Sequence, residues 1–245
     1  MSSLQPSSTT PSPSPQNAAV SAAASAPAPA LRVQQGSVEQ LQQFAAAGYL
    51  YALLDATGHP GVPQKAQELG ERAVSLFQGT PEENYWDVAP YLFQVDESTL
   101  SWIHSSLNQE PWGVFAMSRA GIDDLRRHFR RFLLVELPDG ERWYFRYYDP
   151  RILKVYLPAC DETELRQFFG HAESGVRAFG LADPDTRKLL FIHRPDAGVS
   201  LVAPEAAAAE SVADLLWKIR PAQIAALEAA ASEQQPQPSA PPSQG

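Results

Sequence analysis

Cysteine, catalytic glycine motifs and long apolar runs are all scarce or missing in this chain. Its 245 residues include one cysteine, Cys160, so no intramolecular disulfide can form and a disulfide-stapled secreted fold is excluded. No apolar stretch approaches the roughly 20 residues that cross a bilayer. The N-terminus also lacks the charged and apolar segments of a secretory signal. We therefore expect a soluble cytoplasmic protein that does not enter membranes, with Cys160 as a plain buried thiol.

Signatures of catalysis and metal binding are missing too. The sequence has no G-x-S-x-G, Walker or strand-following G-x-G-x-x-G pattern. None of the histidines has a metal-ligand spacing; they are His59, His104, His128, His171 and His193. We therefore expect no metal ion, no cofactor and no enzymatic activity.

Charge is unevenly distributed along the chain. The formal net charge of −9 argues against nucleic-acid binding, because phosphates would repel an acidic protein. Residues 119–151, however, hold eight arginines against six acids. A locally basic surface on an acidic protein suits an acidic protein partner.

Composition divides the chain into four segments. Residues 1–30 and 233–245 are rich in Ser, Pro, Ala and Gln and are predicted to be disordered, because they cannot bury enough apolar surface. Between them, short strands interleave with short helices over residues 32–200, which predicts an α/β domain, or alternatively α+β, with a mixed sheet. The Ala-rich stretch 205–232 predicts a small helical appendage in two pieces, interrupted by Pro221.

Hydrophobic periodicity and turn residues place the elements of the domain. The predicted strands are 49–54, 73–77, 91–95, 112–117, 176–181 and 189–193. The predicted helices are 38–45, 64–72, 98–107 with Ser98 as N-cap, 122–131, 151–157 and 162–169.

A β-hairpin is predicted between residues 132–137 and 142–148, across the turn at Pro138-Asp139-Gly140. Strand alternation would divide the side chains of 142–148 between two faces. One face would carry Trp143, Phe145 and Tyr147, and the other Arg142, Tyr144, Arg146 and Tyr148.

Arginines crowd the helix at 122–131. Arg126 and Arg130 lie one turn apart, as do Arg127 and Arg131, and like charges at this spacing repel by a few tenths of a kcal/mol. Either a partner or an internal acid could relieve that repulsion, and the sequence leaves both open. Arginine and aromatic side chains are favoured where a surface holds another protein. Our candidate partner-binding residues are Arg126, Arg127, Arg130, Arg131, Arg146, Tyr148 and Arg151.

The corner after the hairpin has a structural interpretation as well. Asp149 followed by Pro150 is typical of a helix start, with Asp as N-cap and Pro at the first position. Arg146 and Arg151 flank this corner and could either pair within the fold or face a partner.

Several short motifs, taken in order, resemble the type VI secretion adaptor proteins (Tap/Tec chaperones), a family catalogued as a domain of unknown function. The resemblance covers about residues 47–195, and the Phe145–Arg151 motif is its most specific part. The matching pieces are 76–79, 89–92, 112–115, 128–133, 145–151 and 168–170. Trp112, Gly113, Phe145, Asp149 and Pro150 are the motif residues to which we assign a structural role.

The resemblance implies a function without catalysis. Proteins of this family bind a toxic effector in the bacterial cytoplasm and help to load it onto the secretion spike, a VgrG or PAAR-type protein. Two alternatives stay open. One is an uncharacterised enzyme built around Arg146, Asp149 and Arg151. The other is a scaffold whose C-terminal helices, within residues 205–245, dock in a partner's groove.

Overall fold

The computed structural model describes residues 31–57, 59–77, 86–107, 112–171, 175–183, 186, 188–194, 217–218 and 221–233. The tails predicted at 1–30 and, apart from Glu233, at 233–245 lie outside these residues, as do residues 195–216. Among the residues described, no helix is long and apolar enough to span a membrane.

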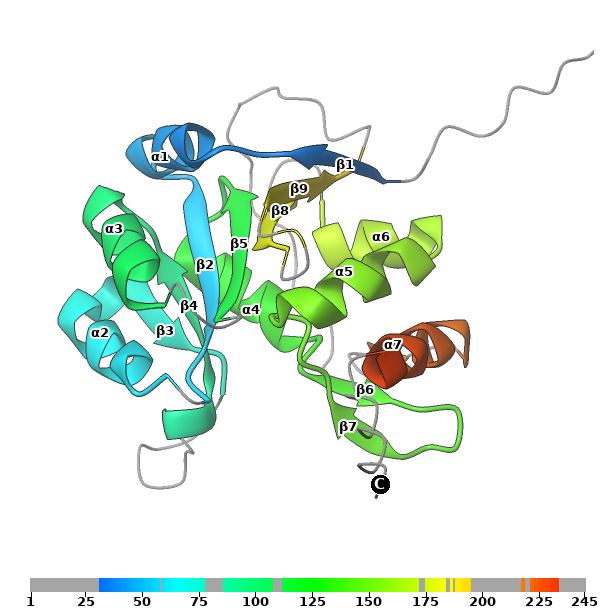
Figure 1. The fold of residues 1–245 in the computed structure, drawn as a ribbon. Helices are drawn as coiled ribbons and strands as arrows, with labels where there is room; N and C mark the ends of the chain where they lie inside the picture. The colour runs from blue at the N-terminus through cyan, green and yellow to red at the C-terminus, as the bar shows by residue number, and fades with distance from the viewer. Residues whose placement is uncertain are drawn as a thin grey trace, which may run out of the picture.

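Seven strands form the main sheet in the order β1-β9-β8-β5-β2-β4-β3, and each neighbouring pair is antiparallel (Figure 1). With helices on both faces, this confirms the predicted mixed α/β class. The strands are β1 (Arg32–Gln35), β2 (Leu50–Asp55), β3 (Ala73–Ser75), β4 (Pro90–Gln94), β5 (Gly113–Ser118), β8 (Val176–Ala182) and β9 (Leu189–His193). The sequence did not predict β1. All four of its residues are exposed, so the segment lacks the alternation of apolar and polar residues that indicates a strand.

Helices cover the sheet on two sides, so the domain has three layers. One side carries α1 (Val38–Ala46), α2 (Gly61–Leu69) and α3 (Glu97–Ser106), with 3-10 turns at Gly70–Arg72 and Trp86–Val88. The other side carries α4 (Ile122–Arg130), α5 (Pro150–Ala159) and α6 (Glu162–Phe169). All six helices were predicted, within a few residues at each end.

The central strand β2 shows how the two layers are built. All six of its residues are buried, and successive side chains point to opposite faces of a sheet. Leu50, Ala52 and Leu54 join the apolar cluster under α1, α2 and α3, whereas Tyr51 and Leu53 join the cluster under α4, α5 and α6. A continuous apolar run is thus the signature of a strand covered on both sides.

A second, three-stranded sheet lies apart from the first, in the order β10-β6-β7 (Figure 1). Its strands are β6 (Leu134–Glu136), β7 (Arg142–Tyr144) and β10 (Trp217–Lys218). The predicted hairpin is confirmed, but β7 ends at Tyr144, not at Tyr148. The predicted alternation is therefore wrong beyond Tyr144: Tyr147 and Tyr148 are both buried, because the chain turns into α5 there.

The C-terminal segment is packed onto the domain. α7 (Pro221–Glu233) lies beside α5, and its Ile224 and Leu227 pack against the core. The Gln223 side chain donates to Cys160 Sγ at 3.3 Å, and Cys160 is only partly buried. The prediction that Pro221 interrupts a helix is wrong, since Pro221 begins α7 and Trp217–Lys218 before it is a strand. Proline suits a first helical position because it lacks the N–H.

One predicted helix cap is also wrong. Asp96 caps α3 in place of Ser98, because its Oδ1 accepts from the Thr99 backbone N–H at 2.8 Å. The Ser98 hydroxyl donates to the same carboxylate at 2.8 Å. Either residue type satisfies an exposed helix N-terminus, and sequence could not decide between neighbours two positions apart.

Candidate functional site

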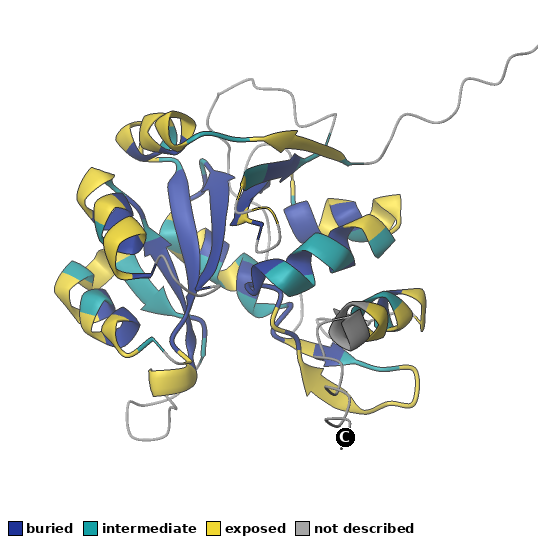
Figure 2. Cartoon of the chain, viewed as in Figure 1, coloured by how far each residue is buried: buried dark blue, intermediate teal, exposed yellow. Residues whose placement is uncertain are grey.

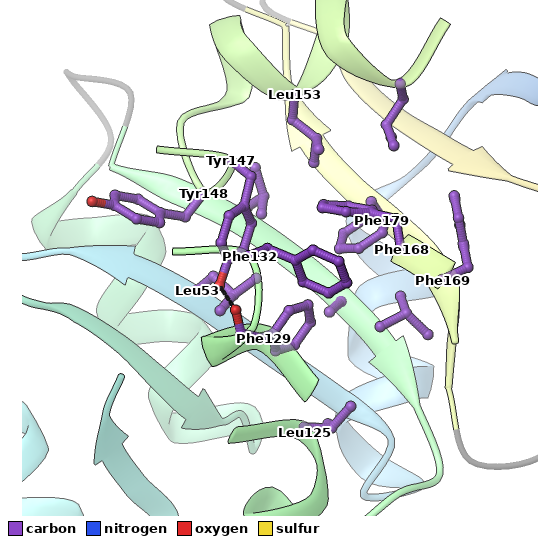
Figure 3. Close-up of a cluster of buried hydrophobic side chains, with 14 of the residues drawn as sticks. Leu53, Leu125, Phe129, Phe132, Tyr147, Tyr148, Leu153, Phe168, Phe169 and Phe179 are labelled. Carbon is purple, nitrogen blue, oxygen red and sulfur yellow. Dashed lines mark hydrogen bonds between the residues drawn. The ribbon is translucent and has the colours of Figure 1, made fainter. Parts of the chain in front are cut away.

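A buried aromatic cluster fixes the segment after the hairpin against α4 (Figure 3). The Tyr147 ring stacks on Phe129 with centroids 6.0 Å apart, and its hydroxyl donates to the Phe129 carbonyl at 2.9 Å. Phe132 and Phe168 meet Tyr147 edge-on. Burial raises the pKa of Tyr147 well above its usual value. The Tyr148 ring lies edge-on to that of Tyr147 at the border of this cluster, with centroids 5.7 Å apart (Figure 3).

Asp149 and Arg151 form an ion pair with each other at the start of α5. Asp149 is the helix N-cap and accepts from the Arg151 backbone N–H at 2.9 Å, with Pro150 at the first helical position. The Arg151 side chain donates to both carboxylate oxygens, from Nε at 3.0 Å and from Nη2 at 2.6 Å. This two-pronged arrangement is the strong form of an Arg–carboxylate contact. The cap predicted from sequence is confirmed.

Arg146 has an internal partner that the sequence did not reveal. Its guanidinium donates to Asp55, a 6 % exposed carboxylate at the end of β2, and forms an ion pair with it. The other Asp55 oxygen accepts from the Thr57 backbone N–H at 2.9 Å. Burial, with Asp55 nearby, raises the pKa of Tyr148. Asp55 directly follows the predicted strand 49–54, but no short-range pattern links it to Arg146, which lies 91 residues further along the chain.

Two more candidate arginines are engaged on or near α4. Arg127 pairs with Asp124 on the exposed side of the helix. Arg131 donates to His128 Nδ1 at 3.1 Å and lies over the Phe132 ring. The other His128 nitrogen, Nε2, bonds the Phe168 carbonyl at 2.8 Å. Burial, with the charge of Arg131, lowers the pKa of His128 to about 4, so His128 is a neutral structural residue that Arg131 supports.

The remaining two, Arg126 and Arg130, have no carboxylate partner among the described residues. Arg126 Nε donates to the Ser75 carbonyl of β3 at 3.0 Å. Arg130 is half-buried, and its side chain makes no hydrogen bond or ion pair within the described chain. Burial and the neighbouring charge of Arg126 lower the pKa of Arg130. The repulsion expected at this spacing is therefore not relieved by an acid of the described fold.

Exposed apolar side chains gather on the hairpin next to these arginines. Leu134, Trp143 and Tyr144 are 39 %, 57 % and 66 % exposed. Leu134 and Tyr144 are cross-strand neighbours, and the Tyr144 ring lies 5.7 Å from that of Phe77. Exposed aromatic side chains beside arginine are typical of protein-binding surfaces. Sequence analysis did not choose Trp143 or Leu134, because alternation alone cannot tell which hairpin face stays uncovered.

The motif residues Trp112, Gly113 and Phe145 are buried. Phe145 packs on Tyr156 of α5 with centroids 4.5 Å apart, and Trp112 meets Phe115 edge-on at 5.1 Å. At Gly113, a Cβ would lie 1.9 Å from the Leu53 carbonyl oxygen. These residues therefore serve packing: Gly113 lets β5 lie close to β2, Trp112 packs on β5 and Phe145 packs on α5. In the part of the chain described, no group of His, Cys, Asp and Glu side chains could hold a metal ion.

Comparison with known families finds one similarity. Residues 50–167 match the family described as "Domain of unknown function (DUF4123)". The DUF4123 match begins at β2 and ends in α6, so it contains α4, the hairpin and the Asp149–Arg151 corner. No curated protein and no solved structure matches the chain.

Proposed function

We propose that this protein is a non-catalytic adaptor of bacterial type VI secretion. It binds an effector in the cytoplasm and helps to load that effector onto a VgrG or PAAR-type spike protein. The DUF4123 match over residues 50–167 carries the proposal, because it spans most of the motif series that resembles the effector adaptors.

The corner geometry supports an adaptor over an enzyme. The Asp149 carboxylate accepts hydrogen bonds from the backbone N–H and the side chain of Arg151. The Asp55 carboxylate accepts hydrogen bonds from Arg146 and from the Thr57 backbone. A carboxylate that acts as a general acid or base must lie within reach of a substrate proton. Both carboxylates are instead engaged within the fold, which favours a structural role for this corner.

The C-terminal segment supports the adaptor over the groove-docking scaffold. A helix that docks in a partner's groove presents its apolar side chains outward. Ile224 and Leu227 of α7 instead pack against the protein's own core. These apolar side chains of α7 thus already contact the protein's own core and are not presented to a partner.

Affinity purification of the full chain tests the proposal. The tagged protein is expressed in its own bacterium, and the captured proteins are identified by mass spectrometry. We expect a spike component and the toxin encoded nearby to co-purify. If neither is enriched over a tag-only control, the adaptor function is wrong.

A further inference from the structure

We propose that one face of the molecule binds an acidic, apolar segment of the polypeptide that the adaptor carries. This α4–hairpin face consists of Arg126 and Arg130 of α4 with Leu134, Arg142 and Tyr144 of the hairpin. The identity of the partner as cargo rests on the proposed function, whereas the location and chemistry of the face rest on the structure alone.

Ion pairs distinguish the arginines of this face from five other arginines of the described chain. Five arginines of the described chain pair with carboxylates: Arg72, Arg127, Arg146, Arg151 and Arg166. The Arg126 side chain donates to a backbone carbonyl, and the side chains of Arg130 and Arg142 make no hydrogen bond or ion pair within the described residues. Arg126, Arg130 and Arg142 are thus three cations near the hairpin that pair with no acid of the described chain. Arg32, Arg119 and Arg131 elsewhere also lack one, but Arg119 and Arg131 lie over aromatic rings.

A series of contacts makes the face continuous. Arg126 holds the carbonyl of Ser75, two residues before Phe77, and Phe77 touches the Tyr144 ring. Tyr144 lies opposite Leu134. Arg142 is two positions before Tyr144 in β7, so both side chains point to the same side. The hairpin is exposed along most of its length (Figure 2).

Charge and exposure decide what kind of segment fits. Arg126 and Arg130 repel each other, and carboxylates of a partner would relieve that repulsion while forming charge-assisted hydrogen bonds. Tyr144 and Leu134 offer rings and methyl groups, which need apolar side chains from the partner. A segment that combines Asp or Glu with Leu, Phe, Tyr or Trp satisfies both.

Peptide display on the full chain tests the face. A library of random peptides, roughly 12 residues long, is selected on three immobilised proteins: the native chain, a double variant Arg130→Glu/Arg142→Gln, and the control Arg127→Glu. Arg127 and Arg130 both lie in the last turn of α4, so both reversals meet the same helix dipole. Arg127, however, is already paired with Asp124.

We expect the native chain and Arg127→Glu to select peptides that combine acids with apolar residues. The best peptide should bind the double variant at least about tenfold more weakly in fluorescence anisotropy, a loss of roughly 1.4 kcal/mol. Melting temperatures of the three proteins should agree within a few degrees. The inference is overturned if no peptide is enriched, if enriched peptides lack acids, or if Arg127→Glu loses as much binding as the double variant.

A second copy of the chain is the competing occupant. If the native chain is a dimer in size-exclusion chromatography and the double variant is a monomer, the face is a self-interface and our assignment is wrong. The purification described above then separates the two proposals. Cargo captured equally by native chain and double variant refutes the face and leaves the adaptor function intact. If the peptides bind but no spike protein or toxin is captured, the adaptor function is refuted and the face remains.

Discussion

Asp55 and Arg146 are joined by an ion pair although they lie 91 residues apart in the chain. The carboxylate is buried while the guanidinium is 43 % exposed, so solvent screening reduces the strength of the pair. We expect Asp55→Asn and Arg146→Gln each to lower the free energy of unfolding by about 1–2 kcal/mol. The double variant should lose clearly less than the sum, because each single change leaves the other group without its partner.

Urea unfolding of the four proteins in this cycle measures the coupling. A coupling energy of about 1 kcal/mol or more would establish Arg146 as a residue that holds β2 to the α5 corner. If the losses of the two single variants add fully, the ion pair does not stabilise the fold, and Arg146 is available to bind a partner. Sequence analysis left these two roles open, since the acid that decides between them is distant in sequence.

His128 makes stability depend on pH. Burial lowers its pKa from 6.5 to about 4, so between these values the unfolded chain binds a proton that the folded chain does not. The contribution of neutral His128 to the free energy of unfolding is complete above pH 6.5. It falls as the pH drops, by up to roughly 3 kcal/mol at pH 4. His128→Gln can keep both hydrogen bonds and does not titrate, so its unfolding free energy should change less between pH 7 and pH 4.5.

The exposed His104 of α3 gives a matched control. His104→Gln should leave the pH dependence of urea unfolding as in the native chain. If His128→Gln and the native chain lose equal stability on acidification, the acid sensitivity belongs to other groups and not to His128.

Gly113 allows β2 and β5 to approach one another closely, because it has no side chain. A side chain there would meet the Leu53 backbone at 1.9 Å, and two paired central strands cannot move apart cheaply. We expect Gly113→Ala to lower the free energy of unfolding by more than about 3 kcal/mol, measured by urea or thermal unfolding. Gly121 is the control, since nothing lies near its Cβ position. It is the N-cap of α4 without a side-chain bond, so Gly121→Ser should be neutral or stabilising.

Most elements could be predicted from short-range pattern, and the exceptions have physical reasons. Apolar runs located β2 and β5 because both faces are covered. The hairpin was predicted too long because Phe145 and Tyr147 continue a strand-like alternation while their rings enter the core beneath α5 and α6. β10 depends on pairing with β6, far away in sequence, and two residues give no periodicity of their own.

At the scale of the whole molecule, the C-terminal segment belongs to the domain. α7 contributes Ile224 and Leu227 to the core, and β10 pairs with β6. Deleting residues 205–245 should therefore lower the melting temperature by several degrees, as differential scanning calorimetry would measure. An unchanged melting temperature would show that the segment is a separable appendage. The deletion alone cannot test docking by this segment, because binding could be lost through reduced stability of the hairpin.

The location of the candidate face could be predicted only in part. Sequence analysis found the concentration of arginine, but it could not tell which of the seven candidates the fold uses internally. That distinction depends on Asp55, Asp124, Asp149 and His128, whose proximity is set by the tertiary structure. Arg142 and the exposed hairpin side chains emerge only once β6, β7 and α4 are placed together.

The two sides of α4 differ in how far they are buried. Leu125 and Phe129 enter the aromatic core, whereas Arg126 and Arg130 lie on a half-buried side that reaches the solvent. Substitutions on the outward side can consequently accumulate with little penalty to folding, and those on the inward side cannot. Under the adaptor function that we propose, exchanging a few surface cations and rings would redirect the protein to a new cargo on an unchanged scaffold.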